Sequence, residues 1–393
     1  MAVTNPGRAA SVARVESDPT AYSRADWTDF GHVGLETLAG RYLRRFWQPV
    51  YRAQDLREGR AVPVKILNED FTLYRGQDGA AHALAFRCAH RGTQLSTGWV
   101  EGDNLRCFYH GWVYGPDGQC VEQPAEPEPF RQRIKIRSYP VQEYLGLIFV
   151  YFGEGEAPAL PRYPEFEGPG IIEVSLHRRM CGFFNNLENS CDEAHISFTH
   201  RNAFDDYVES IPEISGEETA YGIVRYGHRP GDKLRIAHIH MPNMQQLGGA
   251  PRGEGSGWRG SVAWRVPVDD ESHIIPHVTR MQLTAAAEEQ YHRRRSLASA
   301  APIDVAEFGA SVLRGEARIE DLADRRSLVP IQDEVTQVGQ GRIADRTNEH
   351  LGQSDAVIVL LRSIWARELR SLAEGRPLKH WRRSAELELP SDE

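Results

Sequence analysis

Two short segments of the chain each place a cysteine and a histidine close together. The first is Cys88-Ala89-His90 and the second is Cys107-Phe108-Tyr109-His110, and a glycine lies within two residues of each histidine. Thiolate and imidazole are both good ligands for a transition metal, and glycine lets the backbone turn tightly around a buried ion. The spacing therefore predicts a metal site shared by two neighbouring loops.

Two kinds of metal site compete for these four ligands. A structural zinc site accepts two thiolates and two imidazoles, but it usually takes them in like pairs, Cys-x₂₋₄-Cys and then His-x₃₋₅-His. Here the pattern is Cys-x-His-x₁₆-Cys-x₂-His, so each segment mixes the two types. Mixed pairs favour a [2Fe–2S] cluster in which one iron binds both thiolates and the other binds both imidazoles. The pattern resembles the Rieske ferredoxin domain, whose ligands match Cys88, His90, Cys107 and His110 position by position.

A second pair of histidines, His195 and His200, follows Asp192. On a regular helix five positions rotate a side chain by about 140°, so the two imidazoles can share a metal only where the helix loosens or ends near Ser197. Taken alone, His-x₄-His is more simply two unrelated histidines. In context, Asn189-x₂-Asp192-x₂-His195-x₄-His200 lies downstream of the first pattern and resembles the mononuclear-iron motif of the Rieske non-haem iron oxygenases. The resemblance covers nearly the whole chain.

The resemblance implies a facial triad of two histidines and one carboxylate, which leaves positions open for O₂. Asp333 stands where the family places its carboxylate, at the start of a late helix, and Glu334 is the alternative. An acid that caps or stabilises the first helical turn is the simpler explanation of Asp333. The other carboxylates that compete for this role are Asp345, Glu349 and Asp355.

The resemblance gives Asp192 a catalytic role other than metal binding. In the family this aspartate bridges an iron-binding histidine of one subunit to a cluster histidine of the next, which here means His195 or His200 and His110 of the partner subunit. A carboxylate between two imidazoles fixes their tautomers. The alternative is that Asp192 serves one histidine only. Asn189 is expected to support the metal ligands or to contact substrate.

Composition limits the partners and the compartment. Five cysteines are an odd number at irregular spacing, and two are assigned to the cluster, so we expect a reducing cytoplasm and no disulfide framework. The net charge of −9 argues against nucleic acid as a partner. No apolar run is long enough to span a membrane, and no export signal is visible at the N-terminus. The other cysteines, Cys120, Cys181 and Cys191, are expected to be buried thiols without a catalytic role.

Hydrophobic periodicity predicts two domains of the α+β class. Period-two runs at residues 62–67, 71–74 and 84–86 predict a small antiparallel β-sandwich that holds the two ligand loops. Residues 153–170 are rich in Gly, Pro and Glu, which is typical of a linker. The second domain is predicted to be an antiparallel sheet flanked by helices, with strands at 221–226, 234–241, 260–268 and 273–284 and helices at 285–297, 330–342 and 355–372.

These signals divide the chain into three parts. We predict an N-terminal arm at residues 1–40, a Rieske [2Fe-2S] domain at 41–155 and a catalytic mononuclear iron domain at 156–393. A short helix is predicted within residues 35–48, and Pro49 would end it.

The resemblance implies a terminal oxygenase that holds one [2Fe–2S] cluster and one mononuclear Fe(II). The sequence has no plant-type ferredoxin cysteine set and no Gly-x-Gly-x-x-Gly fingerprint, so electrons from NAD(P)H are expected through a separate reductase or ferredoxin. The chain looks most like the branch of the family typified by phthalate dioxygenase and aromatic O-demethylases. That branch acts as a homotrimer or a multiple of trimers on small aromatic substrates.

The expected reaction is O- or N-dealkylation, by monooxygenation, of an aromatic compound that carries a carboxylate or a methoxy group. Ring cis-dihydroxylation is the alternative within the class. Outside the class stand a Rieske electron carrier without catalysis and a zinc-stabilised binding module. The candidate substrate contacts are Asn186, His238 and Met241, with Met244 nearby. His238 shares a strand face with His240, and both could instead be structural.

Overall fold

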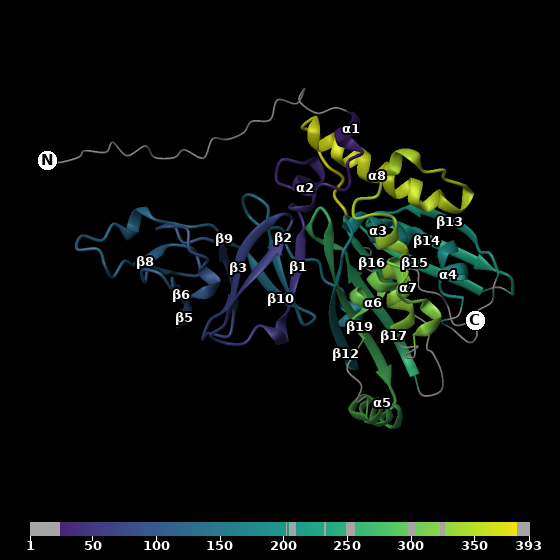
Figure 1. The fold of residues 1–393 in the computed structure, drawn as a ribbon, viewed down its shortest axis with the longest axis horizontal. Coiled ribbons are helices and arrows are strands. Elements are labelled where there is room, and N and C mark those ends of the chain that lie inside the picture. The colour runs from purple at the N-terminus through teal and green to yellow at the C-terminus, as the bar shows by residue number, and fades with distance from the viewer. Residues whose placement is uncertain are drawn as a thin grey trace.

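The structure is a computed structural model that describes residues 24–201, 203, 210–231, 233–248, 256–297, 303–322 and 327–382. These residues form two lobes side by side (Figure 1). The smaller lobe is built from short strands, and the larger lobe contains one broad sheet covered by helices. The architecture confirms the α+β class and the small N-terminal β domain predicted from the sequence.

The smaller lobe contains three sheets, and all of its strand pairs are antiparallel. The outermost sheet carries the loops that hold the two Cys/His pairs. The sheets, in strand order, are β1 (Trp47–Arg52), β11 (Leu147–Tyr151) and β10 (Val141–Tyr144); β2 (Ala61–Ile66), β3 (Glu69–Arg75), β4 (Ala81–Ala85) and β9 (Ser138–Tyr139); and β5 (Trp99–Glu101), β6 (Asn104–Arg106), β7 (Val113–Tyr114) and β8 (Cys120–Glu122).

The larger lobe contains an eight-stranded antiparallel sheet. Successive side chains of a strand point to opposite faces, so each strand contributes to both sides of this sheet. In order across the sheet the strands are β12 (Ile171–Arg179), β19 (Ser272–Leu283), β17 (Ser256–Trp264), β16 (Met244–Gly248), β15 (Lys233–His240), β14 (Gly222–Arg229) and β13 (Glu213–Glu218), with β18 (Val266–Asp269) paired to β19.

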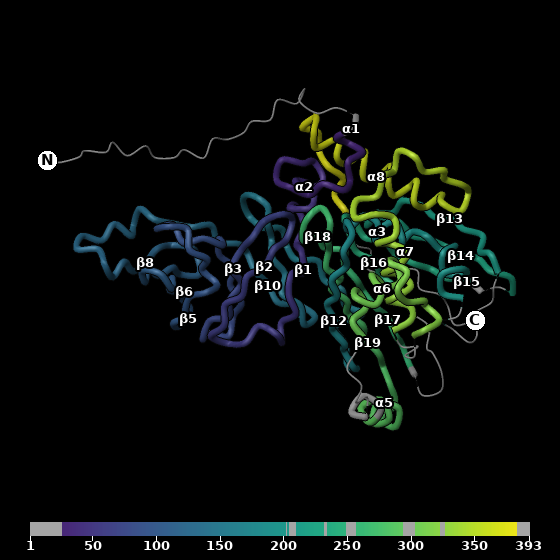
Figure 2. Tube along the Cα trace, viewed as in Figure 1, coloured from purple at the N-terminus to yellow at the C-terminus, as the bar shows by residue number. Residues whose placement is uncertain are grey.

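Eight α-helices lie within the described residues. They are α1 (Arg24–Trp27), α2 (Leu38–Leu43), α3 (Phe183–Cys191), α4 (Ala194–Thr199), α5 (Ala285–Leu297), α6 (Val305–Leu313), α7 (Leu328–Gly339) and α8 (Ala356–Ala373). Helix α8 buries the apolar stripe that its sequence predicts, including Leu361, Ile364 and Trp365. Helices α1 and α2 lie against α8 (Figure 2), so the N-terminal part of the described chain joins the larger lobe. None of the helices in the described ranges is long and apolar enough to cross a lipid bilayer.

The chain around Pro49 differs from the sequence prediction. Helix α2 is shorter than expected and ends at Leu43, and Pro49 lies inside strand β1 instead of closing a helix. The register of β1 against β11 shifts just after Pro49, and a bulge is a position where a strand tolerates a residue without an N–H. Pairing with β11, a contact between residues about a hundred positions apart, therefore overrides the local helical spacing.

The predicted linker lies against the body of the protein. Residues 153–170 contain no strand, the indole N–H of Trp47 donates to the carbonyl of Pro158 at 2.7 Å, and Phe166 is fully buried. One apolar core runs across this segment and includes residues from both sides of it. Within the described residues, no sheet mixes strands from before and after residue 155, and on this ground we propose that the domain boundary lies there.

Helix α3 is fixed to the sheet by a buried polar contact. The ring of His273 on β19 lies 2.7 Å, at Nδ1, from the carbonyl oxygen of Cys181 and 2.9 Å, at Nε2, from the side-chain nitrogen of Asn186. Nδ1–H therefore donates to the carbonyl, and Nε2 accepts from the amide of Asn186, which describes a neutral imidazole. Burial, together with the charge of Arg179, lowers the pKa of His273 to about 3.

We expect acid to weaken the folded state through His273. The unfolded chain takes up a proton near pH 6.5 and the folded chain resists it, so stability from the neutral ring is complete above about pH 6.5 and declines toward about pH 3. His273→Asn should reduce the pH slope of the free energy of unfolding by up to about 1.4 kcal/mol per pH unit. Denaturant titrations at a series of pH values measure this slope. His292→Asn, at an exposed helix position, is the control, and equal slopes in both variants would contradict the assignment.

Candidate active site

The two predicted Cys/His segments come together at the outer end of the smaller lobe. The first segment links β4 to β5 and the second links β6 to β7, and the ring centroids of His90 and His110 are 4.5 Å apart. Both loops close in the same way, because the N–H of Gly92 donates to the carbonyl of Cys88 and the N–H of Gly111 donates to that of Cys107. Both glycines have φ above +70°, a conformation that a side chain would strain.

These four side chains fit a [2Fe–2S] cluster in donor chemistry. Both thiols are buried, and Nδ1 of His90 is buried without a hydrogen-bond partner among the residues that the structure describes. Burial and the neighbouring Cys107 raise the pKa of the Cys88 thiol, so the thiolate form depends on bound iron. The hydroxyl of Tyr114 lies 3.1 Å from the sulfur of Cys88 and accepts the N–H of Ala89 at 3.1 Å, so its own proton points at the sulfur.

We expect Tyr114→Phe to make the reduction potential of the cluster more negative. A hydrogen bond to a cluster thiolate offsets the negative charge that reduction adds, and the variant removes that donor. Redox titration of the visible absorption measures the shift. Tyr74→Phe is a matched control, because Tyr74 belongs to the same core and its hydroxyl donates to the carbonyl of Asp103 instead. A similar shift in both variants would contradict the role of Tyr114.

The second candidate centre combines a break between two helices with a third helix. The structure brings ligand atoms of His195, His200 and Asp333 within 4.8 Å of one another, the only such group found in the described ranges. Helix α3 ends at Cys191, α4 carries His195 in its first turn, and His200 follows the end of α4. The helix therefore ends two residues beyond Ser197, and this change of direction lets both imidazoles face Asp333 on α7. Because α4 ends at Thr199, His195 and His200 do not keep the 140° separation expected on a regular helix.

The break between α3 and α4 is held by buried charges. Glu193 is completely buried and pairs with Arg225 and Arg229 on strand β14, each at 2.5 Å. The guanidinium group of Arg225 also donates to the carbonyl oxygens of Ser190 and Asp192, which end α3. Sequence reasoning missed this cluster. Its only signal was an Arg-Tyr-Gly-His-Arg run, which puts both arginines on one face of a predicted strand.

Asp192 and Asn189 lie beside the three candidate ligands. One carboxylate oxygen of Asp192 accepts the backbone N–H groups of Ala194 and His195, and the other lies 3.5 Å from Nδ1 of His195. Burial alone would raise the pKa of Asp192, but its hydrogen bonds and the charge of His195 lower it below the usual value. The side-chain amide of Asn189 lies 3.5 Å from an oxygen of Asp333.

Of the competing carboxylates, only Asp333 joins the group. Its Oδ1 lies 3.4 Å from Nε2 of His200. Burial raises the pKa of Asp333, but His200 and Arg179 outweigh this effect, so the carboxylate form is favoured. The alternative ligand, Glu334, pairs instead with Arg179 at 2.9 Å. The remaining candidates have other partners: Asp345 caps a turn at Thr347, Glu349 pairs with Arg362, and Asp355 accepts the N–H of Gly352. Two imidazoles and one carboxylate are the donor set of a non-haem Fe(II) site.

Comparison with known proteins agrees with this geometry. Residues 46–143 match the Rieske [2Fe-2S] domain family. The chain is 32% identical over 370 residues to the phenoxybenzoate dioxygenase subunit alpha of Ectopseudomonas oleovorans, with 87% of this chain and 84% of that protein covered. The chain belongs to the Rieske non-haem iron oxygenases.

Two further comparisons support the same family and fold. This oxygenase is 29% identical to the 5,5'-dehydrodivanillate O-demethylase oxygenase subunit of Sphingobium sp. strain SYK-6, over 87% of this chain and 79% of that protein. Its fold is similar to that of the oxygenase in the oxygenase and ferredoxin complex of carbazole 1,9a-dioxygenase, with a TM-score of 0.64, 21% identity and 89% and 93% of the two chains covered. Relatives of this kind are terminal oxygenase subunits of multicomponent systems.

A residue that sequence reasoning missed orients one of the oxygenase's candidate iron ligands. The side-chain oxygen of Gln332 lies 2.9 Å from Nδ1 of His200 and accepts its proton. The lone pair of Nε2 then faces Asp333. Gln332 precedes Asp333 directly, but nothing in the sequence pairs it with a histidine 132 positions earlier.

Gln332→Leu is expected to weaken iron retention at this site about 10- to 100-fold. The imidazole of His200 would lose the acceptor that fixes its tautomer and ring orientation. Competition of the purified protein with a ferrous chelator, followed by iron analysis, measures the change. Gln340→Leu, at the exposed end of the same helix, should retain iron like the unchanged protein. Equal retention in both variants would rule out the positioning role.

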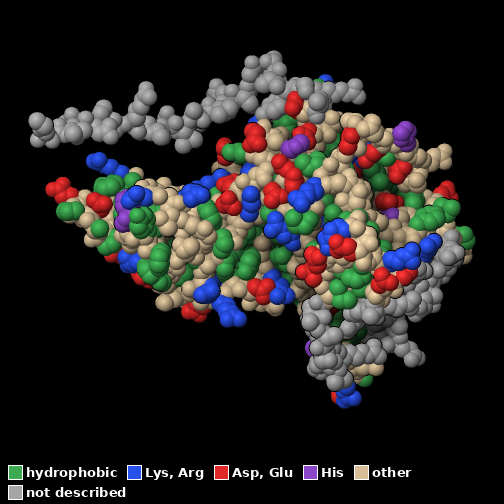
Figure 3. Space-filling model, in the orientation of Figure 1, with side chains coloured by type: hydrophobic (Ala, Val, Ile, Leu, Met, Phe, Trp, Pro, Cys, Tyr) green, Lys and Arg blue, Asp and Glu red, His purple; other side chains and the backbone are tan. Residues whose placement is uncertain are grey.

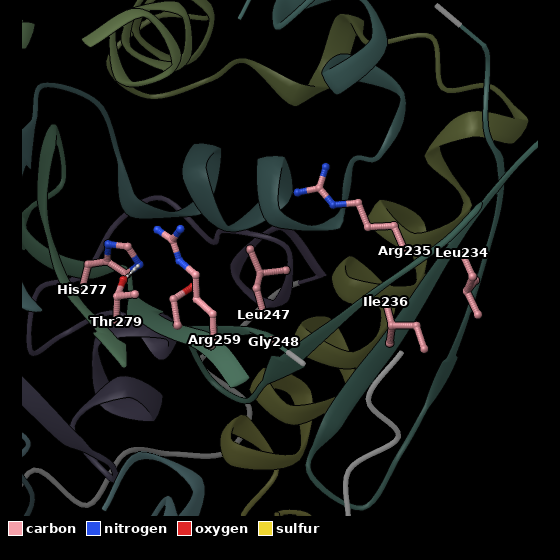
Figure 4. A pocket seen from close by; sticks show the side chains of 10 residues that line it. Leu234, Arg235, Ile236, Leu247, Gly248, Arg259, His277 and Thr279 are labelled. Carbon is pink, nitrogen blue, oxygen red and sulfur yellow. Dashed lines mark hydrogen bonds between the residues drawn. The ribbon is translucent and has the colours of Figure 1, made fainter. Parts of the chain in front are cut away.

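The oxygenase has a cavity of about 380 Å³ on the face of the large sheet that carries α3. Arg225 and Gln245 both donate to the carbonyl of Ser190 on α3, so their side chains lie on the face that α3 covers. Alternation along β15 and β16 puts Arg235 and Leu247 on the same face. Figure 4 shows the side chains of Leu234 and Ile236 on the side of β15 opposite to Arg235. The side chains that line the cavity from this face are Arg235, Leu247, Arg259, Ser261, His277 and Thr279.

The predicted substrate contacts are not among the described residues that line this cavity, and their role stays a prediction. Asn186 is buried and bonded to His273 and Arg265. His238 lies on the opposite face of the sheet, where its ring bonds to the hydroxyl of Tyr221 at 2.7 Å. Met241 and Met244 are buried in the apolar core. The sequence pattern predicts the strand that contains His238, but which face of that strand meets the helices depends on tertiary packing.

The three cysteines without an assigned role are buried. Burial raises the pKa of both Cys181 and Cys191 to about 12, and it also raises that of Cys120. Thiols in such surroundings stay protonated, and they pack as small apolar side chains.

Proposed function

We propose that this terminal oxygenase oxidises an aromatic compound that carries a carboxylate or a methoxy group. The observation that carries the proposal is the convergence of His195, His200 and Asp333 on the same side of the sheet as a cavity that two arginines line. Iron held by these residues would supply the chemistry of O₂ activation, and a cluster held by Cys88, His90, Cys107 and His110 would supply an electron. The chain's own contribution is to orient the imidazole of His200 through Gln332, keep Asp333 ionised and orient the substrate.

The electrons come from NAD(P)H through a separate reductase or ferredoxin. Support comes from the exposed aromatic side chains around the cluster loops: Trp99, Phe108, Tyr109 and Phe130 are 40–59% exposed. Figure 3 shows hydrophobic side chains and a histidine together on the outer end of the smaller lobe. Large exposed apolar side chains grouped in one place mark an interaction surface. The five cysteines are free, which fits a reducing cytoplasm.

The working unit is a homotrimer or a multiple of trimers. Within one chain, strands β5, β6 and β8 lie at the end of the molecule away from α3, α4 and α7 (Figure 1), so the cluster and iron of one chain are poorly placed for electron transfer. Asp192 keeps 26% of its side chain exposed, beside His195. A second copy can thus bring His110 of the partner subunit to Asp192, which then joins the two centres through one carboxylate.

The reaction is O- or N-dealkylation, with ring cis-dihydroxylation as the alternative. In O-demethylation one oxygen atom of O₂ enters the methyl group and the other leaves as water, with two electrons and two protons consumed. The hemiacetal then releases formaldehyde and a phenol. The relatives named above include both a dioxygenase and an O-demethylase. Formaldehyde from a methoxylated substrate would identify dealkylation, and a cis-diol would identify the alternative.

Iron and sulfide analysis tests the assignment of the two centres. A cluster plus one iron gives three iron and two sulfide per chain, whereas an electron carrier gives two and two and a zinc module gives neither. Asp333→Ala should lower the content to two iron and two sulfide and abolish turnover, with the visible spectrum unchanged. Asp345→Ala removes an exposed carboxylate that lies close to Asp333 in the sequence, and this variant should keep all three iron atoms. Three iron in Asp333→Ala protein would exclude this residue as a ligand.

A further inference from the structure

The cavity on the large sheet is positively charged. Arg235 on β15 and Arg259 on β17 both line it, and no aspartate or glutamate is among the described residues that line it. Burial and the charge of Arg265 lower the pKa of His277 to about 4, so this imidazole is neutral near pH 7. Among the described residues, the cavity therefore has two permanent positive charges and no lining carboxylate to balance them.

The two arginines differ in the partners that the protein provides. Arg235 lies 3.9 Å from Glu193, whose carboxylate already pairs with Arg225 and Arg229. Arg259 is exposed, and its side chain has neither an ion pair nor a hydrogen bond to any residue in the described ranges. By contrast, Arg265 on the same side of the sheet donates to Asn186, Ala263 and Gln245. An arginine that lines a cavity with all five donors unused is a ready partner for an anion.

The two arginines lie at different distances from the candidate iron ligands, so the two ends of the cavity differ. Arg235 is close to the candidate iron ligands, because its guanidinium group lies 3.9 Å from the carboxylate of Glu193, two residues before His195. Strand β16 separates β15 from β17, so Arg259 starts about 10 Å away from Arg235 across the sheet. The side chain of Leu247 lies between them and offers an apolar surface (Figure 4).

We propose that Arg259 binds the carboxylate of the aromatic substrate and directs the opposite end of the ring toward His195, His200 and Asp333. This inference rests on the proposed function and assigns its substrate to the aromatic acids. The hydroxyl groups of Ser261 and Thr279 and the neutral ring of His277 line the same end of the cavity and complete a polar site for the carboxylate. Leu247 contacts the ring. The carbon that is oxidised is then the one that lies farthest from the carboxylate and still reaches the iron.

Anaerobic binding to the iron-loaded holoenzyme tests the proposal without turnover. The probes are benzoates with a methoxy or phenoxy substituent, each compared with its own amide, which has the same shape and no charge. Isothermal titration calorimetry measures the dissociation constants. Because a charge-assisted pair is lost, each acid that binds should bind about 10- to 100-fold tighter than its amide. Amides that bind as tightly as the acids, or failure of every acid to bind, would overturn the proposal.

Variants separate the role of Arg259 from a structural one. Arg259→Gln should weaken acid binding about 10- to 100-fold and leave amide binding within about twofold. Arg259→Lys, which keeps the charge but loses the bidentate fork, should fall between them. Arg57→Gln removes the same charge at an exposed position of the smaller lobe and should change neither. Equal weakening of acids and amides in Arg259→Gln protein would overturn the assignment.

The result is also separable from the proposed function. If the unchanged protein holds three iron and consumes O₂ with neutral aromatics but not with acids, the oxygenase function stands and the role of Arg259 fails. If the acids bind through Arg259 but no third iron is present, the anion site stands and the oxygenase assignment fails.

Discussion

The break between helices α3 and α4 is the constraint on which the candidate iron site depends, because it places the whole of α4, with His195 and His200, against α7. On a regular helix His195 and His200 would turn about 140° apart, and α4 avoids this by ending at Thr199, just before His200. The break before α4 sets where both histidines lie relative to Asp333 on α7. The buried carboxylate of Glu193 and the guanidinium group of Arg225 hold the chain open at this point. Removing one member of a buried ion pair typically costs about 3–5 kcal/mol, because the other charge is left without a partner. The break is thus held by contacts to the sheet.

The same sheet serves the site in three ways. Strand β14 fixes the helix break, β19 fixes α3 through His273 and Asn186, and β15 and β17 supply the arginines of the cavity. Arg235 belongs to both systems, because it lines the cavity and faces Glu193. The positions of metal ligands and substrate are therefore set by one rigid element. Rigid support of this kind holds reacting groups within the small tolerances that catalysis needs.

The sequence predicts the ligand sets well because their spacing is local. Cys88 and His90, like Cys107 and His110, are separated by one or two residues, and the structure brings the two pairs together as predicted. It also brings Asp333 to His195 and His200, a position that the family resemblance supplied and spacing alone did not. Whether these residues bind iron stays a prediction.

What the sequence does not predict depends on contacts between distant segments. Gln332 reaches His200 across 132 positions, and no local pattern marks that pairing. Pro49 sits in a strand because β11 pairs with it, against its local preference. The face of β15 that encloses the cavity is not predicted for a related reason: alternation puts Arg235 and His238 on opposite faces of β15, but only the packed helices decide which face encloses the cavity.

The most direct measurement of the central claim, that the cluster of one chain reduces the iron of another, is activity of a mixed assembly. His110→Ala protein keeps the triad and Asp333→Ala protein keeps the cluster, and each alone should be inactive. Co-expressed with different tags and purified through both, mixed assemblies place an intact cluster beside an intact triad, so substrate-dependent O₂ uptake should return. Mixed assemblies that contain both chains and remain inactive would contradict the account.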